Sequence, residues 1–125
     1  MSEQDLRPQV WIGHVVLETN QLDETEQFMR LIGMRPIVKR ADLAVLELRG
    51  GTHLVLLFKP EIVADEAKFD LMVEDLQASH QHFIDLGLAP TPIERVSPEH
   101  ERFTLREPAG HVIAFFSNHV SGRPV

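Results

Sequence analysis

The chain has 125 residues, 43% of them hydrophobic, a length and composition that suit one compact domain with its own core. Its formal net charge is -7 and its 12 Lys and Arg residues form no cluster, which argues against a surface for nucleic acid or for an anionic membrane. The absence of cysteine excludes disulfides, thiolate metal ligands and a cysteine nucleophile. The first residues lack the pattern of a signal peptide and no apolar run is long enough to cross a bilayer, so we expect a cytoplasmic protein.

The first half of the chain predicts one helix and four strands. A strand rich in Val and Ile is predicted over Val10–Leu17, and a helix follows that ends near Leu31, where Gly33 and Pro36 stop it. The expected apolar face of this helix consists of Leu22, Phe28, Leu31 and Ile32. Three further short strands are predicted at Arg35–Arg40, Leu43–Leu48 and His53–Phe58.

The second half predicts the same order of elements after a charged linker at 59–67, which has room for a short helical turn. A strand is expected near Phe69–Val73 and then a helix capped by Asp75. The inward residues of this helix are expected to be Leu76, Phe83 and Leu86. The last strands are predicted at Pro90–Val96, Arg102–Leu105 and His111–Ser117, with a type I turn over 107–110 before the final one.

These similar halves reflect a weak internal repeat. The stretch 14–36 returns 54 positions later as 68–90, with identities at Leu17/Leu71, Leu22/Leu76, Gln27/Gln81, Gly33/Gly87 and Pro36/Pro90. Downstream, Gly51 and Gly110 each open an apolar strand, now at an offset of 59. We therefore expect a single domain in which module one spans about 9–58, module two about 68–118, and 119–125 form a tail.

Two β-α-β-β-β units, His14 in the first strand, the run from Phe28 to Met34 and the Glu-Pro-Ala-Gly-His-Val-Ile motif at 107–113 resemble the vicinal oxygen chelate superfamily. This is the glyoxalase, bleomycin-resistance and extradiol-dioxygenase group. The resemblance implies an α+β fold in which the two modules form a curved mixed-sheet cup around a pocket. It also implies a homodimer and a small-molecule ligand. In metal-using members, four ligands point inward from the first and last strands of each unit.

Only one of the four metal positions carries a suitable residue. His14 offers an imidazole, a ligand that zinc, nickel, iron and manganese accept. The equivalent positions hold Val55, Lys68 and Ala114, and of these only a deprotonated lysine has a lone pair to offer. The residue types therefore leave two alternatives, a lost metal or a rearranged ligand set.

The rearranged set consists of His14, His53 and Asp70, because His53 and Asp70 each lie two residues from a family position and hence on the same strand face. It would hold one divalent metal ion and serve a lyase, isomerase or dioxygenase. Without a metal, the cup would bind an apolar or aromatic compound, with Trp11 or Phe103 as further walls if they face it. A third reading is metal-free catalysis with His14 as general base and Lys68 as its electrostatic partner.

All three readings use one predicted pocket, lined by His14, Val16, Glu18, His53, Val55, Lys68, Asp70, Met72, Val112, Ala114 and Phe116. The remaining histidines are expected outside this pocket. His80 and His82 are expected on the second helix, exposed to solvent. His100, His111 and His119 are expected in loops or in the tail.

Overall fold

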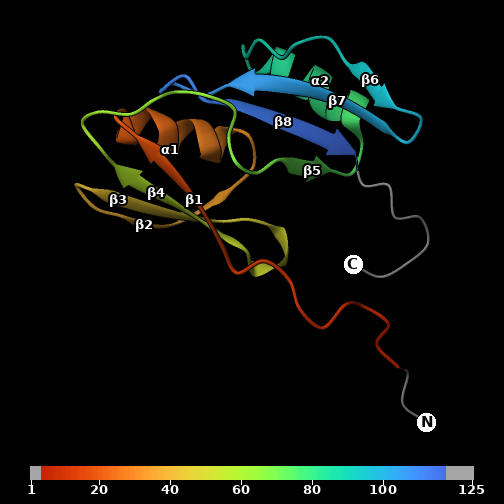
Figure 1. Ribbon diagram of the computed structural model, residues 1–125, viewed down its shortest axis with the longest axis horizontal. Coiled ribbons are helices and arrows are strands. Elements are labelled where there is room, and N and C mark those ends of the chain that lie inside the picture. Colours follow the sequence, from red (N-terminus) through yellow and green to blue (C-terminus); the bar gives the residue numbers. More distant parts are fainter. Residues whose placement is uncertain (1–3, 118–125) are drawn as a thin grey trace.

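The computed structural model describes residues 4–117, and they form the two predicted β-α-β-β-β modules (Figure 1). Module one consists of β1 (His14–Thr19), α1 (Leu22–Leu31), β2 (Arg35–Lys39), β3 (Leu43–Glu47), a short 3-10 turn (Arg49–Gly51) and β4 (His53–Phe58). Module two consists of β5 (Leu71–Val73), α2 (Leu76–Asp85), β6 (Glu94–Ser97), β7 (His100–Arg106) and β8 (Val112–Ser117). Within residues 4–117, no helix is long and apolar enough to cross a membrane.

Each module forms its own four-stranded mixed sheet. Sheet A has the order β1-β4-β3-β2 and sheet B the order β5-β8-β7-β6, with β1 parallel to β4 and β5 parallel to β8. The two sheets lie side by side, and each carries its helix on one face (Figure 1). Among residues 4–117, no helix covers the opposite face of either sheet. We call these the open faces.

The internal repeat predicted the positions of these elements well. The two helices start at Leu22 and Leu76 and have ten residues each, so they follow the offset of 54, and β4 and β8 follow the offset of 59. Gly33 and Gly87 end the two helices with positive φ angles of 122° and 85°, a conformation that glycine adopts without steric cost. The repeat in the sequence therefore corresponds to a repeat of helices and strands in the structure.

Several predicted boundaries were wrong by a few residues. β1 starts at His14 and not at Val10, because β4 starts at His53, which is the register partner of His14, and no strand of the described residues pairs with the segment before His14. β6 starts at Glu94 and not at Pro90, since the prolines upstream cannot donate to a ladder. The linker contains no helical turn; its one ladder contact is a bridge between Glu66 and Val112.

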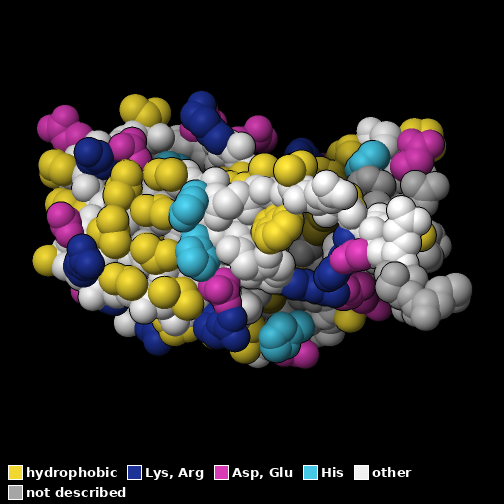
Figure 2. Space-filling view, turned by 90° about the horizontal axis from the view of Figure 1, so that it is seen from below, with side chains coloured by type: hydrophobic (Ala, Val, Ile, Leu, Met, Phe, Trp, Pro, Cys, Tyr) yellow, Lys and Arg dark blue, Asp and Glu magenta, His cyan; other side chains and the backbone are white. Residues whose placement is uncertain are grey.

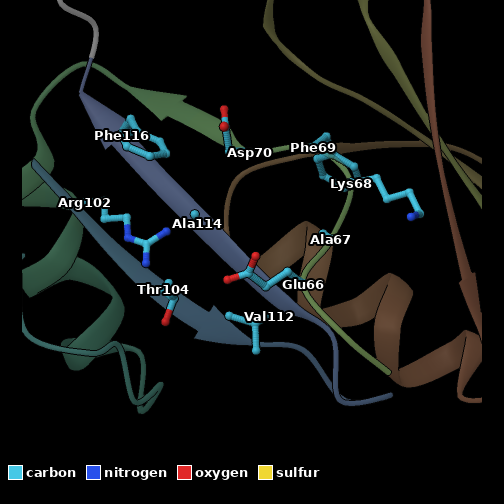
Figure 3. A pocket seen from close by; sticks show the side chains of 10 residues that line it. All are labelled: Glu66, Ala67, Lys68, Phe69, Asp70, Arg102, Thr104, Val112, Ala114 and Phe116. Carbon is cyan, nitrogen blue, oxygen red and sulfur yellow. The ribbon is translucent and has the colours of Figure 1, made fainter. Parts of the chain in front are cut away.

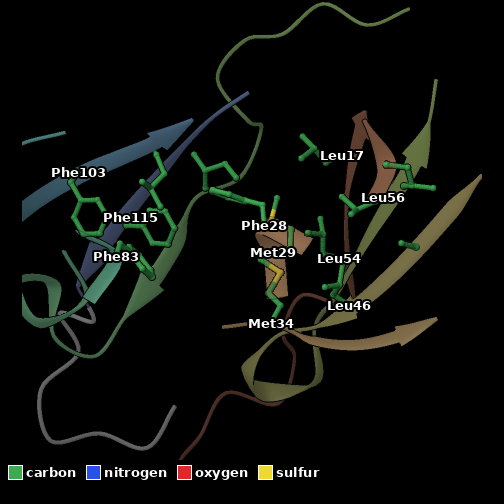
Figure 4. Packing of buried hydrophobic residues seen from close by; sticks show 14 of the residues in the cluster. Leu17, Phe28, Met29, Met34, Leu46, Leu54, Leu56, Phe83, Phe103 and Phe115 are labelled. Atoms are coloured by element: carbon green, nitrogen blue, oxygen red, sulfur yellow. The ribbon is translucent and has the colours of Figure 1, made fainter. Parts of the chain in front are cut away.

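The buried core lies between each helix and its sheet and continues across both modules (Figure 4). In α1, Met29 faces this core and Leu31 is exposed, which corrects the predicted helix face. Leu86, also predicted to point inward, lies just beyond the end of α2 and is exposed. Module two packs its core around three phenylalanine rings whose centroids are 5.1–5.9 Å apart, Phe83, Phe103 and Phe115.

A buried polar network joins the two modules. The Glu107 carboxylate, in the turn before β8, accepts hydrogen bonds from the hydroxyl of Thr25 on α1 (2.8 Å) and from the backbone N–H groups of Ala109 and His111 (3.0 Å each). Because Thr25 has a single hydroxyl proton and gives it to Glu107, the hydroxyl of Thr19 on β1 must donate to Thr25 (2.8 Å). The side chains of Thr19, Thr25 and Glu107 are buried, so these groups compensate one another's desolvation.

His111 makes a second link between the modules. Its Nε2 lies 2.7 Å from the backbone carbonyl oxygen of Glu18 on β1. A carbonyl oxygen only accepts, so Nε2 carries the proton. Glu107 and His111 therefore fix the end of sheet B beside β1 and α1, and they set how the two open faces lie relative to each other.

We expect Thr25→Val to lower the free energy of unfolding by about 1–3 kcal/mol, because valine keeps the shape of threonine but leaves the buried Glu107 oxygen without this donor. Urea denaturation followed by circular dichroism measures the change. Thr25→Ser retains the hydroxyl and should lose less than half as much. Equal losses in the two variants would contradict a structural role for the network.

Candidate functional site

The open face of sheet A is ordered in rows that cross its strands. Residues that pair across neighbouring strands point to the same side, so the strand register assigns each row. The first row is polar and consists of His14, His53, Glu47 and Arg35. The second row contains four valines, Val16, Val55, Val45 and Val38. The third consists of Glu18, Leu57 and Leu43.

This face is exposed to solvent in the single chain. Figure 2 shows it as a field of hydrophobic side chains with histidines along one border and charged groups next to them. Val16 is 51% exposed although it lies in a strand, because no helix covers this side of sheet A. An apolar field of this kind with a polar edge marks a surface that binds another molecule.

The polar row is held together by contacts between neighbouring strands. The Nε2 atom of His53 lies 3.3 Å from a carboxylate oxygen of Glu47, and the guanidinium of Arg35 forms an ion pair with the same carboxylate. The rings of His14 and His53 are in edge contact, with centroids 5.7 Å apart. The row therefore presents two imidazoles next to the valines.

The open face of sheet B carries a cavity of about 240 Å³. It is lined by residues of the linker, β7 and β8 and of the segment before β5, namely Glu66, Ala67, Lys68, Phe69, Asp70, Arg102, Thr104, Val112, Ala114 and Phe116. No residue of sheet A takes part. Within one chain, the cavity thus belongs to module two and its linker.

Charged groups surround a small apolar floor in this cavity. Figure 3 shows the Glu66 carboxylate and the Arg102 guanidinium reaching over Ala114 from opposite sides, whereas Lys68 points away from it. Arg102 forms an ion pair with Glu94, in which its Nε atom lies 3.0 Å from a carboxylate oxygen. The arrangement suits a ligand that has both an apolar body and polar or charged substituents.

The structure divides the predicted pocket residues between the two open faces. Five of them line the cavity of sheet B: Lys68, Asp70, Val112, Ala114 and Phe116. Met72 lies beside Phe116 in the register of the same sheet. The other five, His14, Val16, Glu18, His53 and Val55, lie on the open face of sheet A.

The three candidate metal ligands are divided in the same way. His14 and His53 are neighbours, but Asp70 lies in the cavity of module two. Among residues 4–117, no group of three or more His, Asp or Glu side chains is arranged to hold a metal ion within the single chain. The set therefore remains a prediction that a single copy of the chain does not assemble.

Sequence reasoning missed five polar residues of these surfaces: Arg35, Glu47, Glu66, Arg102 and Thr104. Alternation along the predicted strand 102–105 could have found two of them, because Arg102 and Thr104 alternate with Phe103 and Leu105, which are buried. Phe103 was considered as a wall residue on the condition that it faced the cup, and the condition is not met, because Phe103 packs in the core.

The other histidines lie outside both faces or at their margin. His82 is exposed, as predicted, whereas His80 is half-buried and its Nε2 lies 2.9 Å from the carbonyl oxygen of Thr91. His100 was predicted to lie in a loop, but it is the first residue of β7. His111 belongs to the network between the modules. His119 lies outside the described residues.

No protein-family model matches the sequence. No curated protein matches it either.

Solved structures match the chain over nearly its whole length. Lactoylglutathione lyase from Agrobacterium tumefaciens has a TM-score of 0.76 and 18% identity, and the match covers 93% of this chain and 99% of that one. A bleomycin resistance determinant encoded on the transposon Tn5 has a TM-score of 0.73 and 16% identity, with 89% and 100% covered. A bleomycin-binding protein solved in complex with bleomycin has a TM-score of 0.70 and 17% identity, with 88% and 99% covered. The chain therefore has the two-module fold of the glyoxalase, bleomycin-resistance and dioxygenase superfamily, as its sequence motifs predicted.

Proposed function

We propose that this protein is a glyoxalase/bleomycin-resistance/dioxygenase-like protein that binds a small molecule in a concave pocket, without the full metal site of metal-using proteins of this fold. The main support for the proposal is that the chain has two open faces, one on each sheet. One offers the valine row of sheet A with its imidazoles, and the other offers the cavity around Ala114. Similar proteins include a bleomycin-binding protein solved in complex with bleomycin.

A second copy of the chain would close this pocket. The cavity of sheet B is lined from one module, and the valine row of sheet A is uncovered, so neither face alone encloses a ligand. β1 and β5 are edge strands of their sheets, with one neighbour each. A homodimer that sets sheet A of one copy against sheet B of the other covers the apolar rows and gives the ligand two walls.

The side chains at the four family positions do not fit a four-ligand metal site. Val55 and Ala114 have no donor atom, and a lysine ammonium such as that of Lys68 has no lone pair to offer, which leaves His14 as the single ordinary ligand. The alternative is a metal-dependent lyase, isomerase or dioxygenase that uses His14 and His53 with Asp70. The contact between the two histidine rings favours it, but it requires Asp70 to come from another copy.

Binding of an aromatic anion tests the two-walled pocket. We expect 8-anilinonaphthalene-1-sulfonate to bind the wild-type protein, and both Val55→Asp and Ala114→Asp to weaken it by about tenfold or more, equivalent to about 1.4 kcal/mol. The reason is that each variant puts a carboxylate on one of the two apolar walls. Fluorescence titration of the dye gives the dissociation constants.

Val63→Asp is the control, because Val63 lies in the linker with 88% of its surface exposed and should leave dye binding unchanged. Loss of binding in only one of the two wall variants would place the dye on a single sheet and contradict a shared pocket. Unchanged binding in both would move the ligand site away from the open faces.

Metal content separates the proposal from its alternative. We expect far less than one metal ion per chain, and no difference between wild type and His14→Ala, after purification without chelators and after loading with zinc, nickel, iron or manganese. Inductively coupled plasma mass spectrometry measures the content. One tightly bound ion per chain that His14→Ala removes would overturn the proposal in favour of a metal-dependent enzyme.

A further inference from the structure

The segment before β1 carries large apolar side chains that are mostly exposed in the part of the chain that the structure describes, residues 4–117. Leu6, Val10, Trp11 and Ile12 are 62–83% exposed. We call residues 6–12 the arm. In Figure 1 it runs away from the body of the molecule, on the side of sheet A opposite to α1 and hence on the side of the open face.

The base of the arm is fixed, so its direction is set by the fold. The hydroxyl of Thr52 donates to the carbonyl oxygen of Ile12 (2.6 Å), and the backbone N–H of His53 donates to that of Gly13 (2.8 Å). Near its other end, the Arg7 side chain forms three hydrogen bonds to the Asp5 carboxylate and lowers the pKa of that carboxyl to about 2. The arm thus leaves β1 from an anchored point and carries local order of its own.

We propose that the arm packs on a second copy of the chain, with Trp11 buried at the contact. A copy seated on the open face of sheet A lies on the side into which the arm projects, and the arm continues from the free edge strand β1. Removing its exposed apolar side chains from water gives a driving force for this association. The inference rests on the homodimer of the proposed function and adds the segment that would clasp it.

Trp11 is the single tryptophan of the chain, so its fluorescence reports on the arm alone. We expect light scattering to give the mass of a dimer, and the emission of Trp11 to be blue-shifted and protected from acrylamide. On dilution, the mass should fall to that of the monomer while the emission shifts to the red over the same concentrations. Val10→Ser should weaken dimerisation by about tenfold, since both arms of the dimer lose a valine.

Val63→Ser is the matched control, because Val63 (88%) and Val10 (83%) are similarly exposed in the single chain. A dimer in which acrylamide quenches Trp11 freely would overturn the arm contact and leave the homodimer standing. A monomer at every concentration would overturn both. Protection of Trp11 in the monomer would also contradict the inference, since the arm would then pack on its own chain.

Discussion

The arrangement of the two modules depends on one buried carboxylate. Glu107 sits in the turn before β8, and its oxygens are satisfied by Thr25 of the other module and by the backbone of its own turn. A buried charge without such partners is very costly, so the turn and α1 must come together in this one geometry. With His111 bonded to β1, the same contact directs both open faces towards the side where a ligand or a second copy can approach.

The two faces that result differ in chemistry, although the modules repeat each other. Equivalent positions hold Val55 and Ala114, which leaves a flat valine row on sheet A and a hollow on sheet B. Around the hollow lie unlike charges, including Glu66 and Arg102, whereas the polar edge of sheet A carries imidazoles. A ligand held between such walls needs an apolar body and polar substituents at its ends.

The fold could be predicted from the sequence because the internal repeat gives the same order of helix and strands twice, and each copy supports the assignment of the other. It also placed His14 and Ala114 on faces away from the helices, since alternation along a strand is a reliable signal. It failed where a boundary depends on a partner strand, as at Val10, and where helical spacing allowed two neighbouring faces, as at Leu31. Arg35 and Glu47 of the polar row were missed because the row joins four strands, and their register becomes visible only in the folded sheet.

In the function proposed here, one ligand lies between sheet A and sheet B. Methyl NMR spectra of the protein with 8-anilinonaphthalene-1-sulfonate test it most directly, because Val16 and Val55 report on one wall and Val112 and Ala114 on the other. We predict that a single binding isotherm describes the shifts of all four residues, while the methyl groups of Val63 do not move. Shifts confined to one sheet, or two unrelated isotherms, would contradict a pocket shared by both faces.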